Sequence, residues 1–235
     1  MAPTYVKSKN RDTNGADRTA FDLPFIVRDV ISDIRNKGDA AVRSWSEKFD
    51  RRSPPTFKLS TEEIKSIISG VPKQTVDDTL TVQENVRHFA LAQRKTLRDM
   101  EMEIRPGVYL GPEEHTHQFC RSRSYILGKP ISSARLCAHD HRHRKGGAAG
   151  VPRVLACTPP IKGEVPPATV AAAYFAGADE IWILGGVQAI AAMAIGTGTI
   201  IGKVDFVAGP CNYFVAEAKR QLFGEIGIDL TRWTN

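Results

Sequence analysis

Two glycine-containing turns hold the side chains of this sequence that are best suited to bind a small ligand. Each turn follows a short apolar run and precedes a helical stretch; they read Gly185-Gly186-Val187-Gln188 and Ala208-Gly209-Pro210-Cys211-Asn212. Glycine lets the backbone approach a ligand closely, a helix N-terminus attracts anions, and the amides of Gln188 and Asn212 donate and accept hydrogen bonds. The pattern indicates a binding site. Ordinary strand-to-helix turns are the alternative, because the sequence lacks the G-x-G-x-x-G fingerprint of dinucleotide-binding proteins.

A histidine-rich segment raises the question of metal binding. Five of the six histidines lie close together in the sequence, at His115, His117, His139, His141 and His143. Imidazole is a common ligand of zinc, copper and nickel, and alternation along a strand would place the last three on one face. Neighbouring Arg142, Arg144 and Lys145 would repel a divalent cation, and no second cluster matches this one. The sequence favours a solvated loop over a metal site.

The positive charge of the chain is concentrated in the same segment. The formal net charge is +6, and residues 115–147 hold seven Lys and Arg residues against the single acid Asp140, so they account for all of it. Nucleic-acid binding would call for a regular interleaving of aromatic and basic side chains or a recognisable motif, which this segment lacks. We therefore expect a small-molecule substrate and no nucleic-acid partner.

The composition is that of a globular protein. The 235 residues are 42% hydrophobic and 25% charged, which excludes collagen-like, coiled-coil and disordered classes. No uncharged apolar run reaches the roughly 18 residues of a membrane span, and the first residues lack the apolar core of a signal peptide. The four cysteines form no C-x-x-C pair and fit reduced thiols. These features predict a cytoplasmic protein without a membrane partner.

The first hundred residues are expected to be mostly helical. Apolar side chains recur at helical spacing from Asp22 until Gly38, which ends the helix, and residues 40–49 form a second one. After a short strand at 57–60, Ser60 and Glu63 form a capping box for a third helix. A long helix over 73–99 should bury its apolar face, which consists of Val76, Leu80, Val86, Phe89 and Ala90.

The second half has the rhythm of a parallel sheet. Short apolar runs at 153–157, 180–184 and 204–208 alternate with helical stretches at 168–176, 187–194 and 215–223. In such sheets ligands bind beyond the carboxyl ends of the strands, where the two glycine turns lie. The predicted fold class is α/β, with a flexible N-terminus over 1–20, a mostly helical region over 21–105, and a Rossmann-like parallel-sheet domain over 106–235 in which 112–147 is anomalous.

Two stretches closely resemble histidinol dehydrogenases. GADEIWILGGVQAIAAMAIGTGTI and KVDFVAGPCNYFVAEAKRQLFGEIGIDL are similar to the family signatures G-G-x-Q-A-[IV]-A-A-x-A-x-G-T-E and G-P-G-N-x-[FY]-V-x-E-A-K-R. The helical region resembles the family as well, through V-x-x-I-x-x-I-x-x-x-G-D-x-A-V, an ending of the type F-x-x-x-F-D, and F-A-x-x-Q-R-x-x-L. The resemblance covers about 22–110 and 148–230. The GVQ sequence resembles that of the branch of the family that includes sulfopropanediol dehydrogenases.

The resemblance implies an oxidoreductase that uses NAD and zinc. In the family, histidinol is oxidised through an aldehyde to histidine, the last steps of histidine biosynthesis, by a homodimer of Rossmann-like domains. The cofactor-binding positions of the family match Tyr125, Gln188 and Asn212. A sulfopropanediol-type dehydrogenase is the alternative activity, and a non-catalytic NAD-binding or dimerisation module is the alternative class.

Several family features are missing or altered. The family's catalytic Glu-His pair and its zinc ligands fall beyond Asn235, so we expect no catalytic or metal-binding residue in this chain, an incomplete fold and no turnover. Cys211 stands where the family has a glycine and Gly198 where it has an acid. A Cβ at the Cys211 position is expected to cost about 1 kcal/mol if that position requires a positive φ.

We interpret the anomalous segment as translated out of frame. DNA that encodes HDHRHRKGG can read MTIVTAKVA in the next frame. In the same way, DNA for GKPISSARLCAHD can read GNRYPLLASAHM, and DNA for HTHQFCRS can read IPINSVGA. All three alternative sequences resemble the family. TRWTN at the end similarly permits LAGPT. This hypothesis predicts a sheet that lacks one strand, together with low stability. The hypothesis would be refuted if the next frame of the coding DNA does not encode these alternative sequences.

Overall fold

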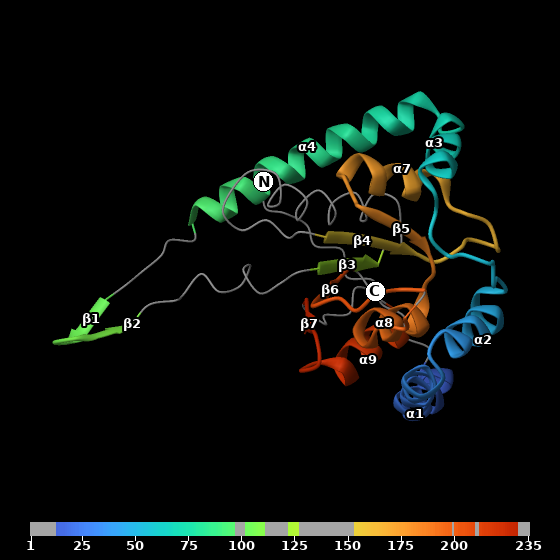
Figure 1. The fold of residues 1–235 in the computed structure, drawn as a ribbon, viewed down its shortest axis with the longest axis horizontal. Helices are drawn as coiled ribbons and strands as arrows, with labels where there is room; N and C mark the ends of the chain where they lie inside the picture. Colours follow the sequence, from blue (N-terminus) through green and yellow to red (C-terminus); the bar gives the residue numbers. More distant parts are fainter. Residues whose placement is uncertain are drawn as a thin grey trace.

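The centre of the protein is one parallel sheet whose strands lie in the order β5-β4-β3-β6-β7 (Figure 1). The computed structural model describes residues 13–96, 102–110, 122–126, 153–198, 200–209 and 212–229. The strands are β3 (Ser122–Ile126), β4 (Arg153–Thr158), β5 (Glu180–Ile183), β6 (Phe206–Ala208) and β7 (Gly227–Ile228). The parallel sheet and the predicted strands of the second half are confirmed.

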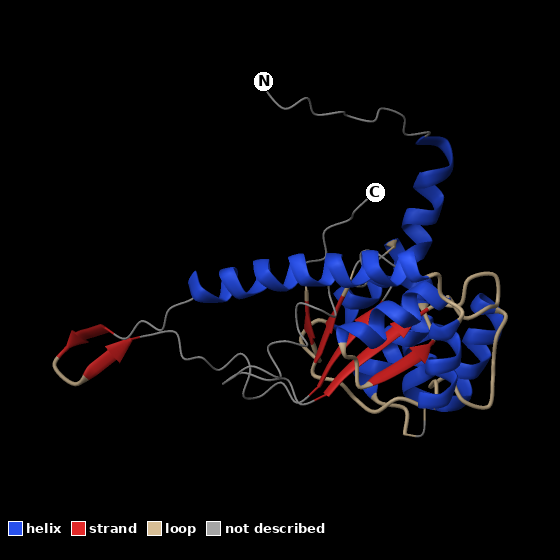
Figure 2. Cartoon of the chain, turned by 90° about the horizontal axis from the view of Figure 1, so that it is seen from above, coloured by secondary structure: helices blue, strands red, loops and turns tan. Residues whose placement is uncertain are grey.

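Helices cover both faces of this sheet (Figure 2). One face packs against α1 (Thr13–Lys37), α2 (Asp39–Asp50), α8 (Gly186–Ile195) and α9 (Tyr213–Leu222). The other packs against α3 (Thr61–Ser69) and α7 (Pro167–Ala176), and α4 (Lys73–Thr96) lies against α7. Both layers are apolar because strand side chains alternate: Leu155 and Cys157 enter the first core, and Val154 and Ala156 the second. The fold is α/β.

The N-terminal helices belong to the same cores as the sheet. Val27, Val30 and Ile34 of α1 are buried against α8 and α9. Since α1 begins at Thr13, its first turns lie within the stretch expected to be flexible. The helical region predicted over 21–105 is therefore divided between the two faces, with α1 and α2 on one and α3 and α4 on the other, and its helices pack against helices of the second half of the chain.

A capping box and an edge bridge fix the chain between α2 and α3. Glu63 N donates to Ser60 Oγ at 3.1 Å and Ser60 N donates to Glu63 Oε2 at 2.7 Å, as predicted. The strand expected at 57–60 is a single antiparallel bridge between Lys58 and Trp182 at the edge of β5. Leu59 N and Ile183 N make its backbone hydrogen bonds, to Ile181 O and Phe57 O.

The predicted buried face of the long helix is wrong in part. Leu80 and Phe89 of α4 are 43% and 65% exposed. The contact with α7 includes a polar side chain instead, since the Nε2 atom of buried Gln83 donates to Ala172 O at 2.9 Å. The helix extends beyond the edge of the sheet layers (Figure 2), so apolar spacing near its C-terminal end had no core to enter. Ala90's side chain lies outside the described residues.

Two further strands form a separate antiparallel hairpin. β1 (Met102–Arg105) pairs with β2 (Val108–Leu110), with Pro106-Gly107 at the turn and Gly107 at φ +77°. All described side chains of both strands are exposed. A search of the described helices found none that is both long and apolar enough to span a membrane.

The sheet has no gap at its centre, contrary to the expectation from the anomalous segment. β3 pairs in parallel with β4 on one side and with β6 on the other. The pairing with β4 runs from Ser122 opposite Arg153 to Ile126 opposite Cys157. Backbone hydrogen bonds on both sides can hold a strand whose sequence, SRSYI, is more polar than that of its neighbours. The rest of 112–147 lies outside the described residues, so the out-of-frame hypothesis stays a prediction.

Candidate functional site

The three residues expected to bind a cofactor follow or end different strands at the same edge of the sheet. Gln188 lies in the first turn of α8, after β5; Asn212 precedes α9, after β6; and Tyr125 is the penultimate residue of β3. Tyr125 is thus part of a strand. Because β4 and β3 separate β5 from β6, the positions of Gln188 and Asn212 are three strand spacings apart, roughly 14 Å. An elongated ligand could contact all three.

The Gln188 side chain is buried and only half satisfied. It is 1% exposed, and its Nε2 atom donates to Asp50 Oδ2 at 3.0 Å. Its Oε1 atom is buried and has no hydrogen-bond partner among the described residues. A buried amide oxygen without a partner is unfavourable in a finished core. It is the kind of acceptor that a bound ligand satisfies.

Asp50 is the residue in contact with Gln188 that the sequence analysis did not identify. It is the last residue of α2 and its half-buried carboxylate accepts hydrogen bonds from Gln188 Nε2 and from the backbone N–H of Gly185. Burial raises the pKa of Asp50 above its ordinary value, and the two hydrogen bonds oppose this shift. The F-x-x-x-F-D ending was the available signal, since it reaches Asp50, but nothing in it indicates a contact with Gln188.

Glycine is required at both positions of the first turn. A Cβ on Gly185 would lie 2.3 Å from Pro159 Cβ and 2.8 Å from Pro159 Cα, so the turn after β5 packs directly on the turn after β4. Gly186 has φ +65°, and a Cβ there would lie 2.7 Å from Gln188 Oε1. The unpaired oxygen is therefore next to a glycine face that carries no side chain.

The second turn is held by a buried ion pair. Asp229 Oδ2 accepts from Gly209 N at 2.7 Å, and Asp229 Oδ1 accepts from Lys219 Nζ. Lys219 is fully buried, and its Nζ atom also donates to Gly209 O at 2.8 Å. Both backbone groups of Gly209 are thus fixed by side chains. This arrangement holds the end of β6 in place relative to α9.

Asn212 caps α9. Its Oδ1 atom accepts from Val215 N at 3.0 Å, and the residue is exposed. With the oxygen engaged in the cap, the amide nitrogen is the group that Asn212 can direct toward a ligand. The first turn offers an acceptor, from Gln188, and the second offers a donor.

Parts of the predicted site fall outside the described residues. These are the Tyr125 side chain, Pro210, Cys211 and the histidine-rich stretch. Within the described ranges, no group of three or more His, Cys, Asp or Glu residues is placed to hold a metal ion. The described residues at the two glycine turns supply no ligand set for zinc.

Comparisons with known proteins agree on one family. The histidinol dehydrogenase family model matches residues 15–232. A histidinol dehydrogenase homolog of Shouchella clausii is 50% identical over 87% of this chain and 47% of its own length. A sulfopropanediol 3-dehydrogenase of Ruegeria pomeroyi is 38% identical over 98% of this chain and 51% of its own length.

A solved structure gives the same result. The crystal structure of histidinol dehydrogenase from Elizabethkingia anophelis matches with a TM-score of 0.74 and 27% sequence identity, over 96% of this chain and 48% of that one. The chain spans about half the length of the curated relatives it matches. The sequence resemblance and the fold are confirmed together: this chain belongs to the histidinol dehydrogenase family.

Proposed function

We propose that this chain supplies the NAD site of an alcohol dehydrogenase of the histidinol dehydrogenase type. The observation that carries the proposal is the buried Gln188 amide, whose Oε1 atom has no partner among the described residues and lies beside the bare face of Gly186. Family membership supports an oxidoreductase, and the position of the site beyond the carboxyl ends of parallel strands supports a nucleotide ligand.

The residues of the edge have complementary roles in this proposal. Gln188 accepts a hydrogen bond from the cofactor, Asn212 donates one, and the N-termini of α8 and α9 favour its anionic phosphates. Tyr125, on the strand between them, is the third contact. Two NAD molecules, bound in turn, would supply the hydride acceptors, one for the oxidation of the alcohol to the aldehyde and one for the oxidation of the aldehyde, with water, to the acid.

The described residues give no role to zinc. In the described ranges no group of three or more His, Cys, Asp or Glu residues could hold a metal ion, so we derive no step through a metal here. The proposed partners are a small-molecule substrate and a second copy of the chain in a homodimer, and the proposed location is the cytoplasm.

Histidinol is the first substrate candidate because histidinol dehydrogenases are among the relatives. A sulfonated diol is the second, since the sulfopropanediol dehydrogenase matches 98% of the chain at 38% identity, while histidinol dehydrogenases of Methanosarcina match 88% at 37% and 38%. These values favour neither substrate over the other. We expect this chain to turn over neither alcohol; turnover of one of them with NAD and zinc would identify the substrate and contradict that expectation.

Isothermal titration of the purified chain with NAD tests the proposal. We expect saturable binding with one site per chain, and weaker binding after Gln188→Met, which keeps the volume of the side chain and removes the acceptor. A chain that shows no heat of binding, or that binds equally well after the substitution, would contradict the proposal. Thermal melts of both proteins establish that the variant is folded.

A further inference from the structure

We propose that Asp50 is a positioning residue that orients the Gln188 amide, so that its Oε1 atom faces a hydrogen-bond donor of the dinucleotide. The inference rests on the proposed function, because the donor belongs to the proposed cofactor. Asp50 itself touches no ligand in this account. It acts through the contact between its Oδ2 atom and Gln188 Nε2 at 3.0 Å.

The orientation follows from the chemistry of the two groups. An amide side chain presents a donor at one end and an acceptor at the other, and rotation by 180° exchanges them. An ionised carboxylate can only accept. Asp50 therefore selects the rotamer in which Nε2 points toward α2 and Oε1 points away from it. Without Asp50, the two rotamers of Gln188 would no longer be distinguished at this contact.

Asp50 is itself held in place. The Gly185 backbone N–H donates to the same carboxylate, and Arg51 ends α2 in the left-handed conformation, with φ 51°. Asp50 thus links the end of α2 to the first turn of α8. The space on the Oε1 side is kept clear by Gly186, where a Cβ would approach Oε1 to 2.7 Å.

Helix stability does not explain an acid at this position. The C-terminus of a helix carries partial negative charge, which disfavours a carboxylate. Burial disfavours the ionised group as well. A residue that both effects oppose, and whose two described hydrogen-bond partners are Gln188 and the turn before it, fits a role in the site better than a role in α2.

A double-mutant cycle tests whether Asp50 acts through Gln188. The variants are Asp50→Asn, Gln188→Met and their combination, with NAD affinity measured by titration calorimetry. We expect Asp50→Asn to weaken NAD binding about tenfold, because the amide presents a donor as well as an acceptor and its NH₂ group can pair with Gln188 Oε1, so the Gln188 rotamer is no longer selected. In the Gln188→Met background the same substitution should change the affinity less than about twofold.

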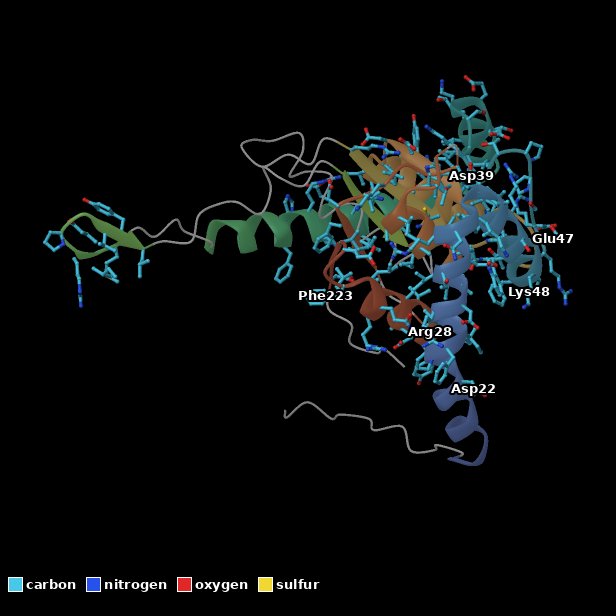
Figure 3. All side chains as sticks on the ribbon, turned by 60° about the horizontal axis from the view of Figure 1, so that its bottom comes forward. Asp22, Arg28, Asp39, Glu47, Lys48 and Phe223 are labelled. Atoms are coloured by element: carbon cyan, nitrogen blue, oxygen red, sulfur yellow. The ribbon has the colours of Figure 1, made fainter. Side chains whose placement is uncertain are left out.

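The matched control is Glu47→Gln, an exposed acid one turn earlier on the outer side of α2 (Figure 3). It should leave the affinity within about twofold of the wild type. Equal weakening by Asp50→Asn in both backgrounds would mean a general structural effect and would overturn the inference. The inference would also be overturned if the wild type binds NAD and the single variant Asp50→Asn binds it with the same affinity.

A second readout does not depend on NAD binding. The side-chain NH₂ resonances of Gln188 in ¹⁵N NMR spectra report the contact with Asp50 directly. We expect them to shift in Asp50→Asn and to stay in place in Glu47→Gln. If the Gln188 resonances are unchanged in Asp50→Asn, the positioning role is overturned, even if the protein binds NAD. If the resonances shift as expected but the wild type does not bind NAD, the result counts only against the proposed function.

Discussion

The two glycine turns at the carboxyl edge are built in opposite ways. In the first, an acid from a distant helix, Asp50, holds a side chain and leaves its acceptor open. In the second, the acid Asp229 holds the backbone of Gly209 and a buried lysine. The first turn thus has an unpaired acceptor, and the second has both backbone groups of its glycine fixed. Similar strand-glycine-helix sequences can therefore be held in different ways, depending on which carboxylate reaches them.

The largest effect is expected from breaking the ion pair of the second turn. Asp229→Ala leaves the fully buried Lys219 ammonium without its counter-charge, which should lower the free energy of unfolding by about 4 kcal/mol. Urea denaturation measures this change. Glu225→Ala is the control, because it removes a carboxylate from an exposed pair with Arg35 and should cost less than about 1 kcal/mol. Equal losses in the two variants would contradict the rigid role of the second turn.

A smaller loss is expected from a steric change in the first turn. Gly185→Ala places a Cβ 2.3 Å from Pro159 Cβ and close to its backbone, and the resulting shift should cost about 3 kcal/mol. Gly70→Ala is the comparison, since the nearest atom to its Cβ is Ile67 O at 3.6 Å. Thermal unfolding of both variants tests the prediction. A Gly185→Ala protein as stable as Gly70→Ala would show that the turn is not tightly packed.

Asn212 allows the structural and ligand roles of one side chain to be separated. Asn212→Ala removes the cap of α9 and should lower stability by about 1 kcal/mol. Asn212→Ser keeps an oxygen for the cap but lacks the amide donor, so we expect near wild-type stability with weakened NAD binding. If Asn212→Ser binds NAD as tightly as the wild type, the donor role assigned to the second turn is wrong.

The smallest expected effect is a pH dependence from Asp50. Because its pKa in the folded protein is raised by burial, folding favours the protonated form. The stability that Asp50 contributes is complete below the ordinary pKa of 3.8 and is lost as the pH rises through the higher folded-state value. As the pH rises across this range, the unfolding free energy of the wild type should therefore fall relative to that of Asp50→Asn. A flat difference curve would refute the prediction.

Local patterns predicted most of the fold. The apolar runs RVLAC and EIWIL indicated the parallel strands, and the Ser60–Glu63 capping box was visible from residue types alone. Such signals act over a few residues, so they survive in any tertiary context. The exposure of Leu80 and Phe89 could not be inferred in the same way, because helical spacing identifies an apolar face but does not reveal whether another element covers it.

The site was predictable only in its outline. Gly185, Gly186 and Gln188 are adjacent in sequence, so the turn could be recognised from its residues. Asp50 is 138 positions away from Gln188, and a pairing over that distance depends on how α2 packs on α8. The same holds for β3, whose polar sequence indicated no strand until its neighbours on both sides were known.

Chemical-shift mapping with NAD tests the central claim most directly. In ¹⁵N-labelled protein, the account predicts that NAD shifts the backbone amides of Gly185, Gly186 and Gln188 together with those of Gly209 and Asn212, at matching concentrations. Shifts confined to residues away from this edge, or to the second turn alone, would contradict a cofactor site formed by both turns.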